Sequence, residues 1–443
     1  MNIRVRAATL IASLLQQRGS LKTLLPEALD GCEPRDRPLL QQLCYGTLRD
    51  LYRLDAIAGR LLKRPFREQD EDLHALLLIG LYQLRSLRIP AHAAVSETVD
   101  GAEHFNKTWA TKVLNAVLRR FQREQQQLEE SLAQDETFQW NHPKWMIEKL
   151  RHNWPDHWQA ILSANDLQGP MTLRVNKRLL TRDKAIELLN QQGIDVIPGR
   201  FSPQALTLSE ARDTDEIPGF ADGAFSVQDE AAQLANQLLD IQPGQRVLDA
   251  CAAPGGKLCH LLEATAKHGD VVAVEMEPSR LERTRDNLER LRLSHECTLH
   301  LGDASAHDWW DGKPFDRILV DAPCSGTGVI RRNPDIKVLR QNEELLGLAS
   351  LQLNILENLW GMLKPGGRLV YATCSVFPQE NERIVQRFVK LHADASSVPV
   401  PLTCGIERPF GRQLFPVEGG HDGFFYAILT KHRDTTASSR GSE

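Results

Sequence analysis

The sequence predicts an all-helical N-terminal region, a small α+β module, and a C-terminal α/β region built on a parallel, doubly wound sheet. Three observations predict this fold class. Apolar residues recur at helical spacing almost throughout residues 1–125, as in amphipathic helices packed around a core. From about residue 235, apolar strand-like runs alternate with helical patterns, as in a sheet covered by helices on both faces. The first of these strands leads into a glycine-containing turn, AAPGGK, at 252–257.

The composition is that of a globular protein. Of 443 residues, 42% are hydrophobic and 25% are charged, and no apolar run approaches the roughly 18 residues of a membrane span. The apolar stretch near the N-terminus is broken by Gln16, Gln17 and Arg18, which favours an amphipathic first helix over a signal peptide. The eight cysteines include no CxxC pair and no zinc-ligand spacing, so we expect a cytoplasmic protein without a bound metal.

The charge is unevenly distributed along the chain. Residues 1–125 carry 19 Lys and Arg against 14 Asp and Glu, a net of +5, whereas the remainder carries 34 against 44, a net of −10. A basic N-terminal part suggests an anionic partner for that part, such as a nucleic acid. Ordinary surface charge is the alternative.

The elements are expected in the following order. The N-terminal part contains helices throughout, and its Gln/Glu-rich end (123–136) is a linker or an exposed helix. The module contains a helix at 140–155, a strand at 171–176, a helix at 181–193 and a strand at 205–210. The doubly wound part contains one helix directly after the glycine turn, a second that ends at Leu291 and a third around 341–363. Its strands are expected at 246–251, 271–276, 297–303, 317–323, 367–374 and 423–431.

These elements divide into three domains and a tail. We expect an all-helical domain at 1–130, an intermediate α+β module at 140–235, a sheet domain at 236–432, and a disordered tail at 433–443.

The turn after the first strand has the features of a cofactor site. Gly255 and Gly256 would let the backbone approach a ligand closely, although the spacing is not GxGxxG. Glu275 ends the second strand, where an acidic side chain can accept from both ribose hydroxyls, and Asp303 could bind an adenine amino group. Together with Asp249, these acids suit a positively charged cofactor such as S-adenosyl-L-methionine rather than a pyrophosphate. A structural turn with solvated carboxylates is the alternative.

Two strand-like runs each end on a cysteine. They read VDAPCSGTG and VYATCSV and contain Cys324 and Cys374. The carboxyl ends of parallel strands meet at one edge of a sheet, so we expect both thiols in one site. A thiolate is a strong nucleophile near neutral pH, although either cysteine alone would more simply be a buried apolar residue.

These motifs carry a family resemblance. The segments DAPCSGTG and ATCS, behind the APGGK turn, resemble the RNA 5-methylcytosine methyltransferases of the NOL1/NOP2/Sun family, over roughly residues 140–430. The resemblance implies a Rossmann-like class I fold that uses S-adenosyl-L-methionine. It implies the cofactor-binding residues Cys251, Ala252, Ala253, Pro254, Gly255, Gly256, Lys257, Glu275, Asp303 and Asp321.

The resemblance also implies catalytic roles. Carbon 5 of cytosine becomes nucleophilic once a thiolate has added to carbon 6, and a base must later remove the proton on carbon 5. The family assigns Cys374 to the attack and Cys324 to the release, whereas Asp321 would bind ring nitrogen N3 and the exocyclic amine.

Two other methyltransferase classes fit the motifs less well. DNA cytosine-5 methyltransferases place their nucleophile in a Pro-Cys pair, which Pro323 and Cys324 also form. Amino-methyltransferases use a (D/N)PP(Y/F) motif at this strand end, from which Ala322 and Cys324 depart.

Further residues near these motifs are candidates for contacts. Lys257 is expected near the methionine carboxylate or the target base, and Leu258 departs from the Thr that is common after GGK in the family. The aromatic residues at 424–425 are core residues or stacking groups. Phosphates around the target could be bound by Arg331, Arg332 and Lys337.

The N-terminal part resembles another family. The segments LLQQLCYGTLR, RIPAHAAVSETV and LNAVLRRF resemble the NusB-type RNA-binding domain. This domain followed by the catalytic module is the arrangement of bacterial methyltransferases that make 5-methylcytosine in small-subunit ribosomal RNA. It implies 16S ribosomal RNA as partner, naked or in early assembly because the base must leave its stack. We expect a monomer. A non-catalytic RNA-binding or antitermination factor is the alternative.

Overall fold

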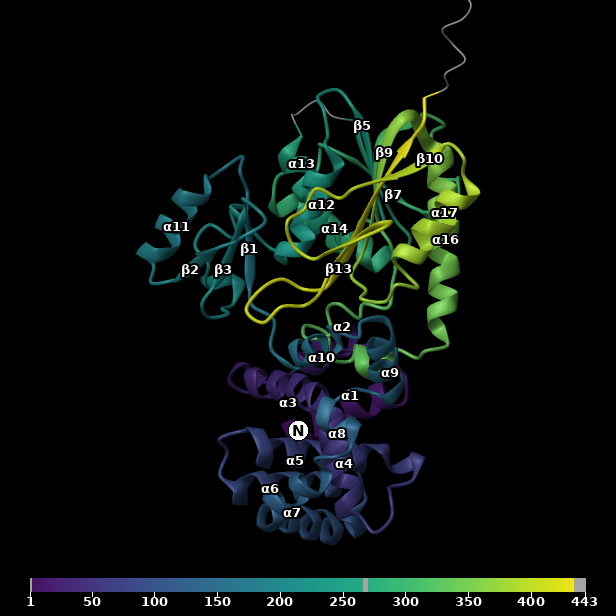
Figure 1. Cartoon of the computed structure of the whole chain (residues 1–443). Coiled ribbons are helices and arrows are strands. Elements are labelled where there is room, and N and C mark those ends of the chain that lie inside the picture. The colour runs from purple at the N-terminus through teal and green to yellow at the C-terminus, as the bar shows by residue number, and fades with distance from the viewer. Residues whose placement is uncertain (1, 266–269, 434–443) are drawn as a thin grey trace, which may run out of the picture. The chain divides into compact units, whose positions relative to one another are not determined.

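The computed structural model describes residues 2–265 and 270–433, which form two compact units (Figure 1). The first unit comprises Met1–Gln168 and Ile330–Asn342, and the second comprises Gly169–Val329 and Glu343–Glu443. This grouping differs from the predicted domains, because 140–168 and 330–342 both join the helical unit. The predicted disordered tail lies outside the described residues, apart from residue 433.

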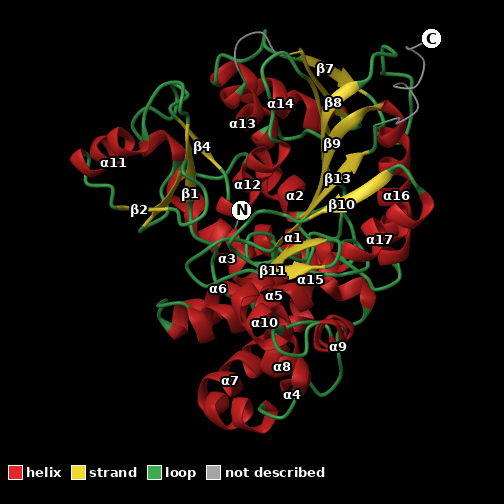
Figure 2. Cartoon of the chain, turned by 45° about the horizontal axis from the view of Figure 1, so that its top comes forward, coloured by secondary structure: helices red, strands yellow, loops and turns green. Residues whose placement is uncertain are grey.

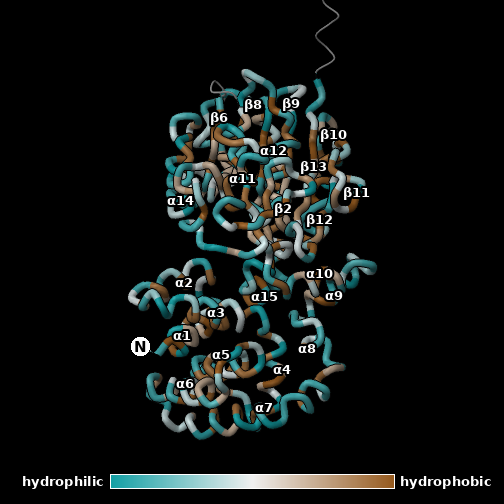
Figure 3. Tube along the Cα trace, turned by 90° about the vertical axis from the view of Figure 1, so that its left-hand side faces the viewer, coloured by the Kyte–Doolittle hydropathy of each residue, from teal (hydrophilic) through white to brown (hydrophobic). Residues whose placement is uncertain are grey.

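The helical unit is built around α5 (Glu71–Ser86), whose residues from Ala75 to Gln83 are all buried. A helix that is apolar on all sides requires partners on all sides. The helices α1 (Ile3–Leu15), α4 (Leu51–Leu61) and α6 (Ala91–His104) pack against it, and Figure 3 shows the hydrophobic residues concentrated along α1 and α5. The other helices of this unit are α2 (Leu21–Leu29), α3 (Arg37–Arg49), α7 (Thr111–Leu132), α8 (Glu136–Trp140), α9 (Lys144–Asn153), α10 (Trp158–Asp166) and α15 (Ile336–Leu339). The predicted all-helical N-terminal domain is confirmed.

Two local predictions in this unit are refined. The Gln/Glu-rich stretch is helical, because α7 continues through it and buries Leu128 and Leu132. The single helix predicted at 140–155 is interrupted. Asn141 ends α8 with a φ of 53°, and Pro143 disfavours helical geometry at the residue before it, so α9 begins afresh.

A small antiparallel sheet opens the second unit, with strand order β2-β3-β1-β4. The helix α11 (Arg182–Gln191) begins at Thr181, whose side chain accepts from the backbone N–H of Lys184. The sequence patterns missed β2 and β4, because three residues are too few to show alternation. The strands are β1 (Thr172–Val175), β2 (Val196–Pro198), β3 (Ala205–Leu208) and β4 (Phe225–Val227).

The main sheet of the second unit has the strand order β11-β12-β13-β9-β8-β5-β6-β7, with β10 paired to β13. Five neighbouring strands of this sheet are parallel to one another, in the order β9-β8-β5-β6-β7. The order reverses between β5 and β8, where a doubly wound sheet opens a crevice at the carboxyl ends of its strands. The bounds are β5 (Arg246–Ala250), β6 (Asp270–Glu275), β7 (Thr298–Leu301), β8 (Phe315–Asp321), β9 (Leu363–Thr373), β10 (Ala395–Val398), β11 (Ile406–Arg408), β12 (Gly411–Leu414) and β13 (Phe424–Lys431).

Helices cover both faces of this sheet, as predicted. Figure 2 shows α12, α13 and α14 on one face and α16 and α17 on the other. Their bounds are α12 (Glu230–Leu239), α13 (Gly256–Ala264), α14 (Pro278–Arg290), α16 (Glu344–Met362) and α17 (Glu382–Leu391).

The last strand runs against the predicted direction. β13 is antiparallel to β9, whereas an entirely parallel sheet was expected. A strand buried on both faces is apolar along its length in either direction, so its direction cannot be predicted from the pattern. The polar strands β10, β11 and β12 were missed for lack of an apolar run. Within the described residues, no helix combines the length and the apolarity that crossing a bilayer requires.

Candidate active site

The turn after β5 departs from ordinary backbone geometry. Cys251 has a φ of 62°, and the peptide bond between Ala253 and Pro254 is cis. Gly255 has a φ of 94°, and a Cβ there would lie 3.1 Å from the side chain of Thr284, so this position requires glycine. Gly256 has more room, and α13 begins there. The turn therefore brings the backbone of 252–256 and the amino end of α13 to the carboxyl edge of the sheet.

Glu275 holds this turn from the end of β6. Its carboxylate accepts from the backbone N–H of Ala253 at 3.2 Å and from that of Glu277 at 3.1 Å. Arg280 forms an ion pair with it at 3.4 Å. Asp303, after β7, accepts from the backbone N–H and the hydroxyl of Ser305 at 2.8 Å each. Glu275 and Asp303 therefore lie at the ends of the adjacent strands β6 and β7, as predicted. Glu275 also holds the turn through its hydrogen bond with Ala253.

Asp249 is the unusual acid of the set. It lies on β5 with no exposed surface, and neither carboxyl oxygen has a hydrogen-bond partner among the described residues. Burial, followed by the nearby carboxylates of Asp321 and Glu275, raises its pKa to about 8. A buried carboxyl group without a partner is costly, and a positively charged ligand would compensate it. These carboxyl groups therefore suit S-adenosylmethionine, which carries a positively charged sulfonium and a positively charged ammonium.

The two cysteines meet at adjacent strand ends. Cys324 follows β8, Cys374 follows β9, and their Sγ atoms lie 3.5 Å apart. The parallel pairing of β8 with β9 places Asp321 opposite Ala372, and the backbone N–H of Gly328 donates to the carbonyl of Cys374 at 2.8 Å. The strand pairing before the cysteines and the Gly328–Cys374 hydrogen bond after Cys324 together hold the two loops next to each other.

The thiols differ in their electrostatic surroundings. The contact with Cys374 is the main cause that raises the pKa of Cys324, burial adds to it, and the carboxylate of Glu380 adds further. Cys374 instead interacts with the Lys257 ammonium, which lies on the cofactor turn. Two thiols in contact cannot both ionise readily, so ionisation of Cys324 is disfavoured.

A buried polar cluster, which the sequence patterns did not reveal, fixes both cysteine loops. The carboxylate of Glu380 accepts from the hydroxyls of Ser325 and Ser375 at 2.6 Å each, and from the backbone N–H of Ser325 at 2.8 Å. Gln352 donates to the same carboxylate at 3.2 Å. All four side chains are fully buried. The signal in the sequence is a serine directly after each cysteine.

Lys257 pairs with Asp321 rather than pointing away from the sheet. Its Nζ lies 2.7 Å from the Asp321 carboxylate and 5.1 Å from the ring centre of Phe424. Burial lowers the pKa of Lys257, but the ion pair with Asp321 outweighs it, so the pKa is raised. Lys257 is therefore a cation beside the thiols. Phe424 and Phe425 are buried in the core.

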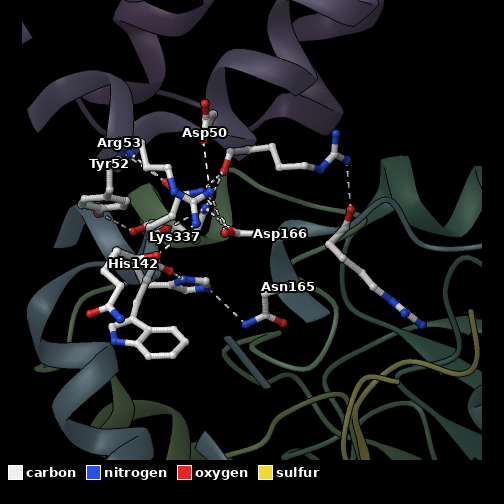
Figure 4. A network of polar contacts seen from close by, with 12 residues as sticks. Asp50, Tyr52, Arg53, His142, Asn165, Asp166 and Lys337 are labelled. Carbon is white, nitrogen blue, oxygen red and sulfur yellow. Dashed lines mark hydrogen bonds and ion pairs between the residues drawn. The ribbon is translucent and has the colours of Figure 1, made fainter. Parts of the chain in front are cut away.

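Two of the three predicted phosphate contacts after the Cys324 loop, Arg331 and Lys337, need correction, whereas Arg332 is half-buried. Lys337 is 1% exposed and donates to the carbonyls of Arg49 at 2.7 Å and Asn141 at 2.9 Å (Figure 4). It also lies 3.5 Å from the carboxylate of Asp166. Burial lowers its pKa to about 8, and the Asp166 carboxylate offsets part of this effect. Arg331 is also 1% exposed. Neither side chain can bind phosphates in this conformation, because the segment is packed inside the helical unit.

No cluster of three or more His, Cys, Asp or Glu side chains is arranged to hold a metal ion in the part of the chain that is described. The side chains described above bring thiols, carboxylates and one ammonium group together at the carboxyl edge of the sheet.

Three family models match successive parts of the chain. They are the NusB family at residues 1–123, the ferredoxin-like domain of RsmF/B-like methyltransferases at 142–215, and the 16S rRNA methyltransferase RsmB/F at 236–430. The second match spans the boundary between the two compact units.

Two bacterial relatives are similar to the chain over nearly its whole length. The ribosomal RNA small subunit methyltransferase B of Pseudomonas putida is 49% identical over 441 residues, covering 100% of both chains. The protein of the same name from Pseudomonas syringae pv. tomato is 50% identical over 437 residues, covering 97% of each. Among solved structures, PH0851 has a similar fold, with a TM-score of 0.78 and 24% identity over 97% of this chain and 99% of that one.

Proposed function

Because the chain belongs to the ribosomal RNA small subunit methyltransferase B family, we propose that it methylates carbon 5 of one cytosine in 16S ribosomal RNA through a covalent adduct with Cys374. The observation that carries this proposal is the pair of thiols 3.5 Å apart at adjacent strand ends, beside the cofactor turn. A single buried cysteine would have no such partner. Two thiols in contact suit a reaction in which one forms a bond to the base and the other exchanges a proton.

The Cys374 thiolate adds to carbon 6 of the cytosine, and the electron pair of the 5,6 double bond becomes available at carbon 5. S-adenosylmethionine supplies an electrophilic methyl group when it is bound. Carbon 5 then carries both the new methyl group and its original hydrogen. Removal of that hydrogen as a proton restores the double bond and expels Cys374 as a thiolate.

Cys324 is placed to act in the second half of this reaction. A base that removes the proton from carbon 5 must lie close to the nucleophile, and Cys324 contacts Cys374 directly. Its raised pKa means that it holds a proton before the reaction, so it must first lose that proton or work through a water molecule. The reverse assignment, with Cys324 as the nucleophile, is opposed by Glu380, whose carboxylate disfavours a thiolate at Cys324.

Asp321 and Lys257 would position the base. The carboxylate of Asp321 suits the exocyclic amine and ring nitrogen N3, and the Lys257 ammonium, 2.7 Å from it, holds the carboxylate in place. The cofactor would be bound by the turn from Cys251 to Lys257, with Glu275 and Asp303 toward its nucleoside and Asp249 toward its positive charge.

The substrate is expected to be free or partly assembled 16S ribosomal RNA. The target base must leave its stack to reach the thiols, at a cost of about a few kcal/mol that is lower in unpaired RNA. Preferential methylation of assembled small subunits over free RNA would contradict this part of the proposal.

Denaturing gel electrophoresis tests the proposed roles. The purified protein is incubated with S-adenosylmethionine and 16S RNA transcribed in vitro, and protein–RNA adducts are detected by their slower migration. We expect an adduct to accumulate with Cys324→Ala, because release is blocked, and never to form with Cys374→Ala. Cys404→Ala, a buried cysteine elsewhere in the same unit, serves as the matched control.

Two other outcomes have defined meanings. An adduct that accumulates only with Cys374→Ala would reverse the two roles. The absence of both adduct and methyl transfer in the wild-type protein would favour a non-catalytic RNA-binding protein.

A further inference from the structure

One buried arginine connects the small sheet of the second unit to the cofactor turn. Arg174 lies on β1 and is 1% exposed. It donates to the carbonyl of Gly256, where the turn enters α13, at 2.8 Å, and to the two carboxylate oxygens of Glu263 at 3.1 and 2.7 Å. Gly256 and Glu263 are seven residues apart on α13 and so lie on one face of the helix. Arg174 therefore holds this face along most of the helix.

Every donor of this guanidinium is occupied. Its Nη1 also donates to the side-chain oxygen of Gln228 at 2.6 Å, and its Nη2 donates to the hydroxyl of Ser226 at 3.4 Å. Together with Gly256 and the two oxygens of Glu263, these partners account for all the N–H groups that an arginine side chain carries. Arg174 therefore has no donor left for a ligand, and any effect on cofactor binding must pass through α13.

The ion pair between Arg174 and Glu263 is suited to fixing geometry. Neither side chain has any exposed surface, and a buried ion pair is often no more stabilising than an apolar pair of similar volume. A guanidinium, however, holds its donors in a rigid planar fork, so its partners are fixed in direction as well as in distance. The contact therefore orients α13 more than it stabilises the fold.

The backbone of the turn before α13 is held by side chains of α14. Arg280 donates to the carbonyl of Ala253 at 3.1 Å, and Asn287 donates to that of Pro254 at 2.9 Å. Cys251, where the turn begins, has a φ of 62°, and strained backbone of this kind persists only when its surroundings fix it. The donor that the small sheet supplies extends this support to the beginning of α13.

A second arginine of the same module binds the opposite end of α13. Arg178 donates to the carbonyls of Leu262, of Glu263 at 3.3 Å and of Thr265 at 2.9 Å, and it forms an ion pair with Glu296 at 2.6 Å. This end of the helix lies roughly 10 Å from its amino end, given a rise of about 1.5 Å per residue. Arg178 thus allows support of the helix to be separated from support of the turn.

We propose that Arg174 is a positioning residue for S-adenosylmethionine, because it holds the amino end of α13 in the place from which the cofactor turn binds the cofactor. The proposal rests on the proposed function, since it assigns a role in the cofactor site named there. Without Arg174 the turn would adopt further conformations, and cofactor binding would have to select the competent one. The small sheet thereby acts on the cofactor site from outside it.

Isothermal titration calorimetry of the full-length protein with S-adenosylmethionine tests this role. The double variant Arg174→Met with Glu263→Met removes the ion pair and leaves neither charge buried without a partner. We expect its Kd to rise about tenfold, as for a turn that keeps its binding conformation in about a tenth of the molecules. The single variant Arg174→Lys keeps the positive charge, but its ammonium cannot serve Gly256 and Glu263 together, so we expect a smaller rise in Kd.

The control makes the same exchange at the other end of the helix. Arg178→Met with Glu296→Met removes the ion pair that does not contact the cofactor turn, and it should retain the wild-type Kd. Thermal unfolding is measured on every variant, so that affinities are compared at a temperature at which all of them are folded.

Hydrogen exchange of the cofactor-free protein gives a second readout, which does not depend on activity. In both Arg174 variants, the peptide of residues 251–259 should exchange its amide hydrogens faster than in wild type, whereas β6 and β8 should be unchanged. A merely structural role would instead accelerate exchange throughout the sheet.

A wild-type Kd in both Arg174 variants would overturn the proposal. So would failure of both variants to fold, or faster exchange across the whole sheet, since Arg174 would then serve stability rather than position. Methylation of 16S RNA is measured on the same wild-type preparation. Its absence alongside cofactor binding that depends on Arg174 would contradict the proposed function but not the role of Arg174.

Discussion

At the scale of single residues, Asp249 is a buried carboxyl group whose surroundings favour its neutral form. It is fully buried on β5 without a partner in the described part of the chain, and its pKa is raised to about 8. An unfolded aspartate loses its proton near pH 4. The folded protein therefore binds one proton more than the unfolded chain between about pH 4 and pH 8, and its free energy of unfolding falls as the pH rises through that range.

Asp249→Asn should remove this pH dependence, because an amide does not ionise. Urea unfolding without cofactor at pH 5 and pH 8 checks this. The free energy of unfolding of the variant, relative to wild type, should rise by at least about 1.4 kcal/mol between the two pH values, which corresponds to one pKa unit. The exposed Asp156→Asn is the control and should show no such trend.

The same variant should bind S-adenosylmethionine more weakly, by about tenfold, because an amide cannot ionise when the positively charged cofactor binds. Isothermal titration calorimetry measures this affinity. Unchanged affinity would mean that Asp249 does not face the positive charge of the cofactor.

At the scale of elements, the short helix α15 fixes the segment that follows the Cys324 loop. Asp335 accepts from the backbone N–H of Leu21 at 2.8 Å, and the hydroxyl of Tyr52 donates to the carbonyl of Lys337 at 2.9 Å. Val338 and Leu339 pack against the helical core. Lys337 donates to the backbone carbonyls of Arg49, at the end of α3, and of Asn141, at the end of α8. The Arg49 carbonyl also accepts from the side chain of Asn141 at 2.6 Å.

Lys337→Met should therefore destabilise the helical unit by about 3 kcal/mol, since it leaves buried carbonyls and the Asp166 carboxylate without this cation. Thermal unfolding measures the effect. Lys144→Met, a lysine on α9 whose side chain is 74% exposed, should change stability by less than about 0.5 kcal/mol. Equal effects of the two substitutions would show that Lys337 has no special role.

At the scale of the whole molecule, the two units differ in what they contribute. Every residue assigned to the cofactor lies in 169–329, within the second unit. The segment 330–342, in contrast, needs the helical unit to cover its apolar side chains. Deleting residues 1–168 should leave the cofactor site formed but should expose that segment.

We expect the truncated protein to bind S-adenosylmethionine within about threefold of wild type, to aggregate more readily, and to lose methyl transfer to 16S RNA. Calorimetry and a methylation assay measure these properties. Full activity of the truncated protein would show that the helical unit is dispensable for both binding and catalysis.

The sequence predicted the site better than its surroundings. Cys324, Cys374, Glu275 and the glycine turn were placed at one edge because strand ends in a doubly wound sheet must converge there. The burial of Lys337 was not predictable, because a run of charged residues ordinarily lies in solvent, and its partner Arg49 is 288 residues away. The Glu380 cluster was missed because polar side chains bonded across loops show no periodicity.

The placement of 330–342 has a consequence for synthesis on the ribosome. The N-terminal unit cannot be completed when its first 168 residues have emerged, because a part of its interior is encoded more than 160 residues later. At about 5–20 residues per second, that delay lasts roughly 10–35 seconds. During this time the carbonyls of Arg49 and Asn141 lack the Lys337 ammonium. Domains generally fold in the order of their synthesis, but here the first unit to be made becomes complete only after the loop that carries Cys324.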